Sequence, residues 1–499
     1  MGRGFQGSRQ ADRNPSNDDP MTFARILKSN AMLAGAQIVT LAAAFVRSKI
    51  IAVALGPAGI GLVGVMTAFN GNVTALAAWG LGTSGVRLIA SAEGAERQRK
   101  QAAVRRFGAI LSACGLVLTL ALFWPITLVT FRENSHAVEL LIAGLAVPCL
   151  IGATAWSSLI QADGQVRPLA FLQIGAAVFG LILGTPLIYF FGTIGIACSI
   201  FLAAALPALT TWRVARRLCP PSDSVVMPDD IKAMIKLGGG LVFVGLASQI
   251  AAYVVRLIVI RHYDGLGEDG LSAAGYYQAA IAIAGSLPAA VFGAMGTDFF
   301  PRVAATKDEA EAQSLSEKQI QAGLLLSLPL LTALLTMGGV GLRVLYDDRF
   351  ESASPLLAWM IWGVFLRLLA WPLGYWMLAK GSLRTVVIVE TASSFSMVVL
   401  PLLLVPRFGV VGAAYAYAIS YVIYAIVMLV VSRSRSGKWL GGEVLAWFGV
   451  AAIWLCSTQV ACHFAGGGWW GLTPTIVAAF GCVALYYRKL SQEREARNE

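Results

Sequence analysis

Charged side chains are scarce in this 499-residue chain. They make up 13% of its residues, whereas about a quarter of the residues of soluble globular proteins are charged. Hydrophobic residues make up 57%, and the mean hydropathy is +0.70. This balance excludes a soluble globule and predicts a polytopic membrane protein. Alternating polar and apolar stretches typical of membrane strands are also absent, so we expect an all-α protein.

Metal ligands and paired cysteines are equally few. Seven cysteines are scattered without a CxxC or metal-ligand spacing, and three histidines lie far apart. We therefore expect no bound metal and no other cofactor. The chain also lacks the GxxxxGK[ST] motif, which excludes nucleotide hydrolysis by that route.

Apolar windows recur at the length that crosses ~30 Å of hydrocarbon, about 20 residues. They predict fourteen transmembrane helices, and the first helix should break at Gly56-Pro57. The predicted spans lie at about 30–54, 59–85, 107–130, 138–160, 168–190, 193–215, 233–260, 272–297, 320–345, 355–379, 384–405, 409–431, 442–462 and 469–487.

Lysine and arginine are concentrated on alternate loops. If the N-terminus is placed in the cytoplasm, 29 of the 38 lysines and arginines lie on cytoplasmic segments, 5 lie on the loops of the opposite side and 4 lie inside spans. Because positive loops stay in the cytoplasm, both termini are predicted to be cytoplasmic. The net charge of +11 then reflects basic loops that face anionic membrane lipids. No basic cluster is interleaved with aromatics, which argues against a nucleic-acid partner.

The chain also contains an internal repeat. QADGQVRPLA at 161–170 matches LAKGSLRTVV at 378–387, and FGTIGIA from Phe191 matches FGVVGAA from Phe408, both at a shift of 217. Near the starts of the two halves the shift is 209, which aligns Arg47 with Arg256. A shared offset and order indicate two six-helix lobes inserted the same way up, with a substrate path between them.

This repeat sets the predicted organisation of the chain. It comprises a disordered cytoplasmic tail (1–21), an N-lobe (22–217), a cytoplasmic linker (218–232), a C-lobe (233–436), two further helices (437–487) and a cytoplasmic C-terminal tail (488–499). The last two helices are expected either to pack on one lobe or to line a groove for a lipid tail.

Three arginines lie deep inside predicted spans: Arg47, Arg256 and Arg367. An ionised side chain at the centre of a span costs about 3 kcal/mol on insertion scales, and more if it finds neither water nor a partner. We interpret these arginines as lining a water-filled cavity that receives an anionic substrate. Arginine suits phosphate or pyrophosphate because its planar fork makes bidentate, charge-assisted hydrogen bonds.

Helical spacing adds neighbours to each arginine. Thr40 shares a face with Arg47, and Gln249 and Tyr253 share a face with Arg256. Trp371 lies one turn from Arg367. The second spans of the two lobes add further polar groups, with Asn70 and Asn72 in one and Tyr276, Tyr277 and Gln278 in the other. The alternative role for these neighbours is ordinary packing and hydrogen bonding between helices.

The candidate substrate-binding residues are therefore Arg47, Arg256, Arg367, Gln249, Tyr253, Thr40, Asn70 and Trp371. Acids inside spans are few, and Glu390 in the eleventh span is the candidate for proton coupling. An exporter of organic cations would need the opposite balance of charge.

The motifs resemble those of the Wzx-type O-antigen flippases. These belong to the polysaccharide transport branch of the multidrug/oligosaccharidyl-lipid/polysaccharide exporter superfamily. The resemblance covers roughly residues 22–436 and rests on a first helix that ends in a cation, on LGPAGIGLVG at 55–64, on QADGQVR at 161–167 and on the two-lobe repeat.

The resemblance implies a MATE-like fold in the bacterial inner membrane. It implies export of a polyprenyl-diphosphate-linked oligosaccharide, an O-antigen or exopolysaccharide unit, to the periplasmic leaflet by alternating access. It places Arg47, Arg256 and Arg367 in a central cavity. The implied partners are this lipid-linked oligosaccharide, membrane lipids and the polysaccharide polymerase and chain-length proteins. Fourteen spans also resemble the lipid II flippases, which leaves the subfamily open.

Three other functions remain as alternatives. A MATE-type multidrug exporter on the same fold is disfavoured by the cations and scarce acids inside the spans. A membrane glycosyltransferase, ligase or polymerase would need a larger outer loop with catalytic acids or histidine, whereas the longest outer connections here have about ten residues. A scaffold without transport activity would leave the cost of the buried arginines unexplained. We therefore expect a transporter and not an enzyme.

Overall fold

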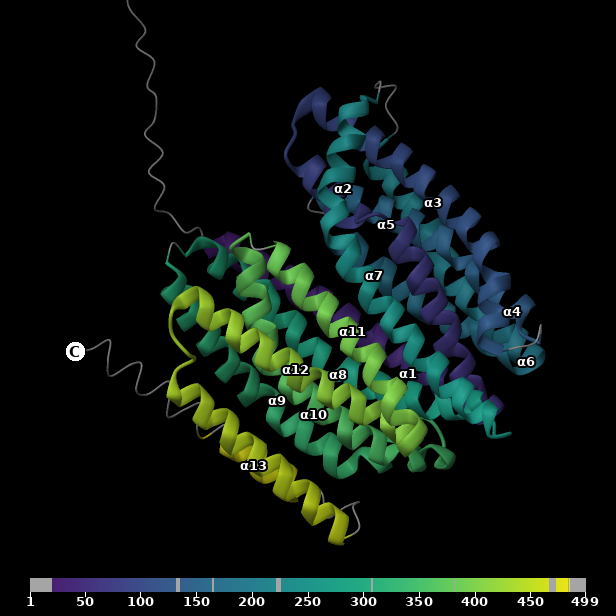
Figure 1. Ribbon diagram of the computed structural model, residues 1–499. Helices are drawn as coiled ribbons and strands as arrows, with labels where there is room; N and C mark the ends of the chain where they lie inside the picture. Colours follow the sequence, from purple (N-terminus) through teal and green to yellow (C-terminus); the bar gives the residue numbers. More distant parts are fainter. Residues whose placement is uncertain are drawn as a thin grey trace, which may run out of the picture.

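The computed structural model describes residues 20–131, 135–163, 166–220, 226–306, 308–381, 383–465, 473–482 and 484. All regular elements in these ranges are helices, as expected from the composition (Figure 1). They are α1 (Pro20–Ala77), α2 (Leu81–Ala90), α3 (Gly94–Phe131), α4 (Ala137–Gly144), α5 (Ala146–Ala162), α6 (Val166–Leu218), α7 (Pro228–Gly265), α8 (Gly270–Ala305), α9 (Glu309–Leu345), the 3-10 helix η1 (Asp348–Ala353), α10 (Ser354–Ala379), α11 (Leu383–Phe408), α12 (Val410–Ser436) and α13 (Gly442–Ala465).

Two of these helices each carry a pair of predicted spans. α1 continues through the first and second spans and is broken at Gly56, whose φ of 67° and ψ of −163° are not helical. The predicted break at Gly56-Pro57 is therefore confirmed. α6 carries the fifth and sixth spans and is broken in the same way at Gly192. Nine described helical segments, α1 and α6 among them, are long and apolar enough to cross a membrane.

Some predicted boundaries differ from the structure. The second span is predicted to reach residue 85, but α1 ends at Ala77 and α2 starts after a turn through Trp79 and Gly80. Both turn residues have a positive φ, and such a backbone cannot continue a helix. The fourth predicted span is divided into α4 and α5. Of the fourteenth span, the structure describes the apolar helix Thr473–Cys482, and both predicted tails fall almost entirely outside the described residues.

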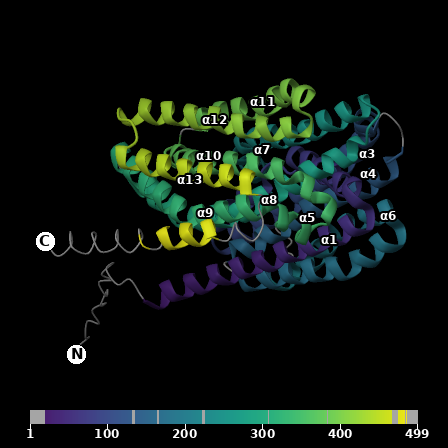
Figure 2. The ribbon, with the colours of Figure 1, turned by 90° about the horizontal axis from the view of Figure 1, so that it is seen from below.

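The helices form two groups that meet along α1, α7 and α8. Figures 1 and 2 place α3 to α6 on one side and α9 to α13 on the other, with α7 and α8 between them. α1 packs on α6 of its own group and also on α7 and α8, and α7 contacts α1, α2 and α3. α13 packs on α9. The lobe boundaries at 22–217 and 233–436 stay an interpretation of the repeat.

One backbone feature follows the repeat closely. Gly192 has φ 56° and ψ −123°, and Gly409, which lies 217 positions later, has φ 60° and ψ −149°. Both glycines stand in the FG motif that reveals the repeat in the sequence. Such dihedrals are almost restricted to glycine, so the same local break occurs at equivalent places in the two halves.

We call α1 to α6 the N-terminal half and α7 to α12 the C-terminal half. The two halves touch backbone to backbone where α1 crosses α8. A Cβ on Gly61 would lie 2.0 Å from the carbonyl oxygen of Leu271, and one on Gly275 would lie 1.9 Å from that of Pro57. Only glycine permits so close an approach.

Side-chain contacts join the halves at both ends of the helices. At the end that holds α2, the Trp79 indole Nε1 donates to the Ile235 carbonyl at 3.1 Å. At the opposite end, Lys49 donates to the Arg343 carbonyl at 3.0 Å, and Arg261 Nε donates to that of Val129 at 2.9 Å. Hydrogen bonds therefore connect the two halves at both ends of the described molecule.

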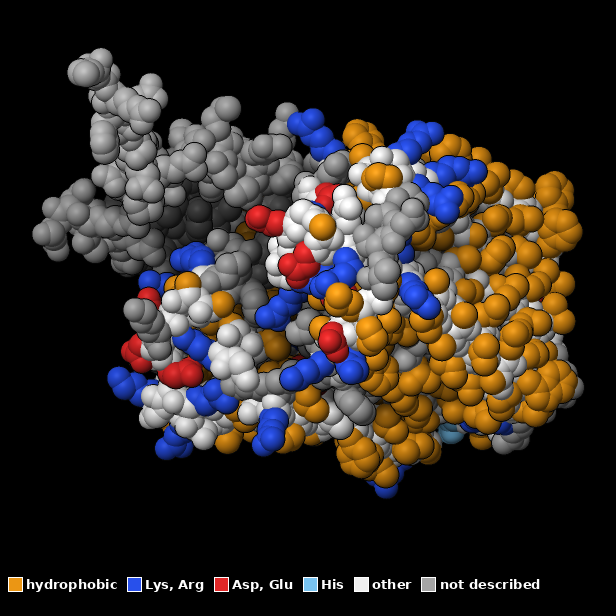
Figure 3. All heavy atoms as spheres, turned by 90° about the horizontal axis from the view of Figure 1, so that it is seen from above, with side chains coloured by type: hydrophobic (Ala, Val, Ile, Leu, Met, Phe, Trp, Pro, Cys, Tyr) orange, Lys and Arg blue, Asp and Glu red, His pale blue; other side chains and the backbone are white. Residues whose placement is uncertain are grey.

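The surface is divided by chemistry. In Figure 3 hydrophobic side chains cover a broad part of the molecule, and Lys, Arg, Asp and Glu gather over another. Large apolar side chains such as Tyr189 and Phe190, each 78% exposed, lie along α6. An apolar exterior of this kind is typical of helices that face lipid.

Candidate substrate-binding cavities

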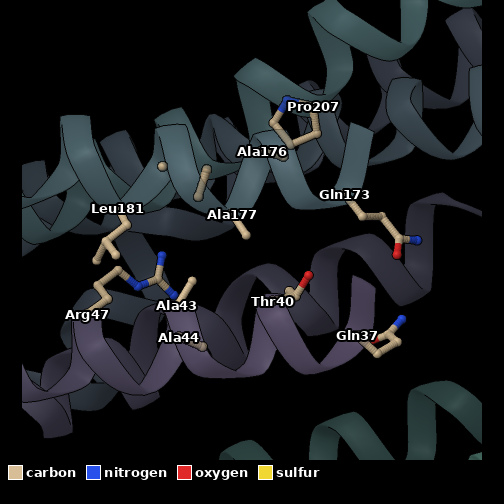
Figure 4. A pocket seen from close by; sticks show the side chains of 12 residues that line it. Gln37, Thr40, Ala43, Ala44, Arg47, Gln173, Ala176, Ala177, Leu181 and Pro207 are labelled. Carbon is tan, nitrogen blue, oxygen red and sulfur yellow. The ribbon is translucent and has the colours of Figure 1, made fainter. Parts of the chain in front are cut away.

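The first cavity lies between α1 and α6 and has a volume of about 400 Å³. Its polar lining consists of Gln37, Thr40 and Arg47 from α1 and Gln173 from α6, and most of the remaining lining is alanine and glycine. Figure 4 shows Arg47 extending from α1 towards α6 beside Leu181. We call this the α1–α6 cavity.

Arg47 is the cation of the α1–α6 cavity. Its guanidinium makes no hydrogen bond or ion pair with the residues that the structure describes. Thr40 lines the same cavity, and its hydroxyl donates to the Ala36 carbonyl of its own helix at 2.9 Å. The cavity therefore offers an uncompensated positive charge, together with the amides of Gln37 and Gln173.

The second cavity lies among α7, α8, α10, α11 and α12 and has a volume of about 260 Å³. Arg256 of α7 and Arg367 of α10 both line it, with the tyrosines Tyr277, Tyr417 and Tyr421. Carboxylates are absent from the described lining residues of this cavity. We call it the two-arginine cavity.

Arg256 is held by neutral partners. Its Nε and Nη2 donate to Gln278 Oε1 at 3.1 and 2.6 Å, and its Nη1 donates to the Ala252 carbonyl one turn earlier. The guanidinium carbon also lies 5.8 Å from the centre of the Tyr277 ring. None of these partners carries a negative charge, so the charge of Arg256 stays available to an anion.

Arg367 lies beside a group of tyrosines and one acid. It is close enough to Tyr421, Tyr417, Tyr424 and Glu390 to interact with them electrostatically. The Tyr424 hydroxyl donates to Glu390 Oε1 at 2.6 Å. The carboxyl proposed for proton coupling is therefore next to the two-arginine cavity, although it is not among the lining residues.

The two remaining candidates on α7 do not line the cavity. The Gln249 carbonyl accepts a hydrogen bond from Asn72 of α1 at 3.2 Å, and the Tyr253 hydroxyl lies 2.6 Å from that of Thr130 in α3. Helical spacing places both residues on the same broad face as Arg256. The two-arginine cavity contacts only the edge of this face that carries Arg256, so neither Gln249 nor Tyr253 lines it. Gln249 and Tyr253 instead contact the other half of the molecule.

Asn70 and Trp371 also make packing contacts. Asn70 is 5% exposed, and its side-chain nitrogen donates to the Ala143 carbonyl of α4 at 2.9 Å. Trp371 stacks on Phe299 with 6.5 Å between the ring centres, and its ring lies 4.3 Å from that of Tyr375. Neither residue is among those that line the two-arginine cavity.

The structure thus brings Arg256 and Arg367 together and places Arg47 in a separate cavity. The two cavities occupy equivalent places in the repeat, because the shift of 209 takes Arg47 to Arg256 and the shift of 217 takes Gly180 to Met397. At the latter shift Gln173, which lines the first cavity, corresponds to Glu390.

Tyr417 and Tyr421 of α12 are absent from the residues predicted from the sequence. Their spacing of four residues, continued by Tyr424 three residues later, is a helical stripe of hydroxyls in an otherwise apolar span. This stripe is the signal that could have found them, because Arg367 interacts with all three tyrosines.

Two protein-family models match this chain over more than half of its length. The model described as polysaccharide biosynthesis protein matches residues 26–307, and the model described as lipid II flippase MurJ matches residues 170–490. Together they cover nearly all the described helices.

Curated relatives point the same way. The lipid III flippase of Escherichia coli K12 is 33% identical over 81 residues, which is 16% of this chain and 20% of that relative. The chain therefore spans about a fifth of the length of that relative. The "Putative O-antigen transporter" of Shigella flexneri is 22% identical over 292 residues, 57% of this chain and 67% of that protein.

Solved structures share the fold. The lipid II flippase MurJ in an inward closed conformation superposes with a TM-score of 0.70 at 15% identity, covering 93% of this chain and 99% of that one. A multidrug MATE transporter in its inward-facing conformation gives a TM-score of 0.58 at 15% identity, covering 80% and 94%. These structures establish the MATE-like architecture, and the family is established by the two models. The chain belongs to the family described as polysaccharide biosynthesis protein, and its C-terminal two thirds also match the family described as lipid II flippase MurJ.

Proposed function

We propose that this protein moves a polyprenyl-diphosphate-linked oligosaccharide from the cytoplasmic to the periplasmic leaflet of the bacterial inner membrane. The observation that carries the proposal is the two-arginine cavity, in which guanidinium groups from α7 and α10 line one small space. Relatives named as flippases of lipid II and lipid III and as an O-antigen transporter favour a lipid-linked saccharide as the substrate.

The chemistry of the two-arginine cavity suits a diphosphate. Two guanidinium groups provide several charge-assisted N–H donors to the phosphate oxygens, and each such bond is about twice as strong as a neutral one. Tyrosine hydroxyls in the lining add neutral donors, and their rings can stack on a sugar. Because Gln278 is a neutral acceptor, it orients Arg256 without cancelling its charge.

The α1–α6 cavity supports a second contact with the anion. Arg47 is a cation beside the amides of Gln37 and Gln173 and the hydroxyl of Thr40. We propose that this cavity binds an acidic part of the same substrate as the two halves alternate between access states. In this scheme each half offers one cationic cavity, and α1 and α8 meet between them.

We further propose that both termini are cytoplasmic. The end of the molecule that holds α2 also carries Arg97, Arg99 and Lys100 at the start of α3, and Arg99 Nε lies 3.1 Å from Asp230 of α7. A basic end of this kind stays on the cytoplasmic side. This orientation gives a diphosphate a favourable field for outward movement, since the cell interior is negative.

The MATE-type multidrug exporter is the alternative on the same fold. It is disfavoured because arginines line both cavities, and carboxylates are absent from the described lining of each. A drug-accumulation assay separates the two functions. An exporter of organic cations would lower drug levels in cells, and a lipid-linked saccharide flippase would not.

The arginines supply the first test. We expect Arg256→Ala, Arg367→Ala and Arg47→Ala each to reduce flipping of the lipid-linked glycan about ten- to a hundredfold. The reason is that a hydrogen bond to a charged group contributes about 1.5–3 kcal/mol. Flipping is measured in proteoliposomes, and insertion is checked by the amount of protein in the membrane fraction.

Arg407→Ala is the matched control. Arg407 is an exposed arginine at the end of α11 and lines neither cavity, so this variant should flip at the wild-type rate. Wild-type activity in all three cavity variants would remove the site assignment. The glycan itself is identified by deleting the gene and determining which lipid-linked glycan accumulates on the cytoplasmic leaflet.

A further inference from the structure

Gln278 of α8 stands between Arg256 and α1. Its Oε1 accepts from Arg256 Nε at 3.1 Å and from Nη2 at 2.6 Å. The same oxygen would lie 2.9 Å from a Cβ built on Gly64 of α1. A single amide oxygen therefore holds the arginine of one half and rests against the backbone of the other half.

The bonds of Arg256 leave a defined part of its guanidinium free. A guanidinium has five N–H donors. Gln278 takes the donor on Nε and one on Nη2, and Ala252 takes one on Nη1. Within the described structure, each terminal nitrogen of Arg256 therefore keeps one N–H that can donate to a phosphate oxygen.

The amide character of Gln278 matters as much as its position. A glutamate in its place would reach the same nitrogens but would form an ion pair, so the arginine charge would be neutralised before the substrate arrives. An apolar side chain of the same length would leave two buried N–H donors without an acceptor, which is costly in a membrane interior. Glutamine orients the guanidinium and preserves its charge.

The location of this contact ties it to the meeting of the two halves. Gly64 and Gln278 lie one turn beyond Gly61 and Gly275, where α1 and α8 touch backbone to backbone. Moving α1 away from α8 at this crossing would remove the surface against which the amide rests. The orientation of Arg256 would then change with the packing of the halves.

We propose that Gln278 is a positioning residue for Arg256 and that it couples the orientation of this arginine to the α1–α8 crossing. The inference rests on the proposed function, because it assumes that Arg256 binds the diphosphate. When α1 and α8 are in contact, the Arg256 guanidinium is oriented to bind the anion. When α1 separates from α8, the guanidinium loses this orientation and the anion is released. The substrate site and the interface between the halves thereby change together.

The test measures binding of farnesyl diphosphate, a soluble prenyl diphosphate, to the purified full-length protein in detergent, with farnesol as the uncharged control. Gln278→Met keeps the length of the side chain and removes the acceptor. Gln278→Glu keeps the acceptor and adds a negative charge. We expect each to weaken farnesyl diphosphate binding about tenfold, with little change for farnesol.

Gly64→Ala tests the coupling, since its Cβ displaces the Gln278 amide and the glycine itself makes no bond to Arg256. We expect it to weaken diphosphate binding by a similar factor. Gly71→Ala is the matched control on α1, because its Cβ would meet the Gln249 side chain instead. It should leave the affinity within about twofold of wild type.

Thermal unfolding separates positioning from packing. A purely structural role for Gln278 would lower the melting temperature of its variants and leave diphosphate binding by the folded protein unchanged, and that result overturns the inference. Unchanged binding in Gly64→Ala overturns the coupling. If the wild type itself does not bind farnesyl diphosphate more tightly than farnesol, the proposed function fails and this inference fails with it.

Discussion

Arg47 and Arg256 meet the cost of burial in different ways. Arg256 recovers part of that cost through hydrogen bonds to Gln278 and to its own helix, and Arg47 lies in a cavity with the polar groups of Gln37 and Thr40. Burial of an ionised group without any such compensation costs several kcal/mol. Because every one of these neighbours is neutral, the positive charges remain available to an anionic substrate.

Glu390 is the acid that could link this charge to protons. Its carboxyl accepts from the Tyr424 hydroxyl at 2.6 Å and interacts electrostatically with Arg367. If proton uptake on this carboxyl drives transport, Glu390→Gln should flatten the dependence of the flipping rate on pH. Proteoliposomes buffered across a range of pH values provide the measurement.

Tyr424→Phe is the control for the Glu390 substitution. It removes the hydrogen bond to the carboxyl but keeps a group that titrates, so its flipping rate should still depend on pH. An unchanged pH profile in Glu390→Gln would exclude proton coupling through this residue and would leave the binding role of Arg367 untouched.

The sequence identifies the three cavity arginines, but it does not predict which of them line the same cavity. Charge is rare inside spans, so Arg47, Arg256 and Arg367 stand out. Arg256 and Arg367 lie on different helices, however, and no local period reports that they line one cavity. Periodicity assigns Gln249 and Tyr253 to the same face as Arg256, but the rotation of α7 in the bundle decides which edge of that face lines the cavity.

At the scale of single elements, Gly56 shapes α1. Its non-helical backbone interrupts the hydrogen-bond ladder of the helix next to Ala52. Arg349 of η1 donates to the Ala52 carbonyl at 3.0 Å from the other half of the molecule. Asp347 accepts from Arg349 Nε at 2.7 Å, and this bond holds the pKa of the Asp347 carboxyl below its usual value. The Asp347 carboxylate orients Arg349 towards α1.

Replacing Gly56 should destabilise this arrangement. In Gly56→Ala a side chain would have to adopt φ 67° and ψ −163°, and its Cβ would lie 2.7 Å from Arg349 Nη1. Strained dihedrals of this kind cost about 1–3 kcal/mol, so the melting temperature in detergent should fall by several degrees. Gly449→Ala in α13, where nothing lies within 4 Å of the added Cβ, should melt with the wild type. Equal melting of both variants would contradict the role given to Gly56.

Most of the helices can be predicted from the sequence. The apolar windows predict the spans, and the Gly56-Pro57 pair predicts the break within α1, because glycine and proline act locally on the backbone. The prediction that the second span reaches residue 85 is wrong, since Trp79 adopts a positive φ that its residue type does not suggest. Its indole bonds to Ile235 in the other half, so tertiary contact and not local propensity ends the helix there.

At the scale of the whole molecule, the repeat accounts for the equivalent cavities. Arg47 and Arg256 occupy matching positions, and each lies on the first helix of its half and lines a cavity within that half. The halves have nevertheless diverged. Arg367 lines only the second cavity, and at a shift of 217 it corresponds to Leu150. The repeat alone therefore does not predict that the second cavity holds two arginines.

Hydrogen bonds connect the two halves at both ends of the described molecule. Trp79 bonds to Ile235 at one end, and Arg349 bonds to Ala52 at the other. In the proposed alternating-access scheme, the contact at one end separates while the contact at the other end holds. The duplication is visible in the sequence, but these long-range pairs follow no period and could not be predicted from it.

The most direct test of the account is a structure of the protein with a polyprenyl-diphosphate-linked oligosaccharide bound. We predict that phosphate oxygens lie about 3 Å from the guanidinium nitrogens of Arg256 and Arg367, inside the two-arginine cavity. A diphosphate bound elsewhere, with both arginines facing only protein or acyl chains, would contradict the central claim.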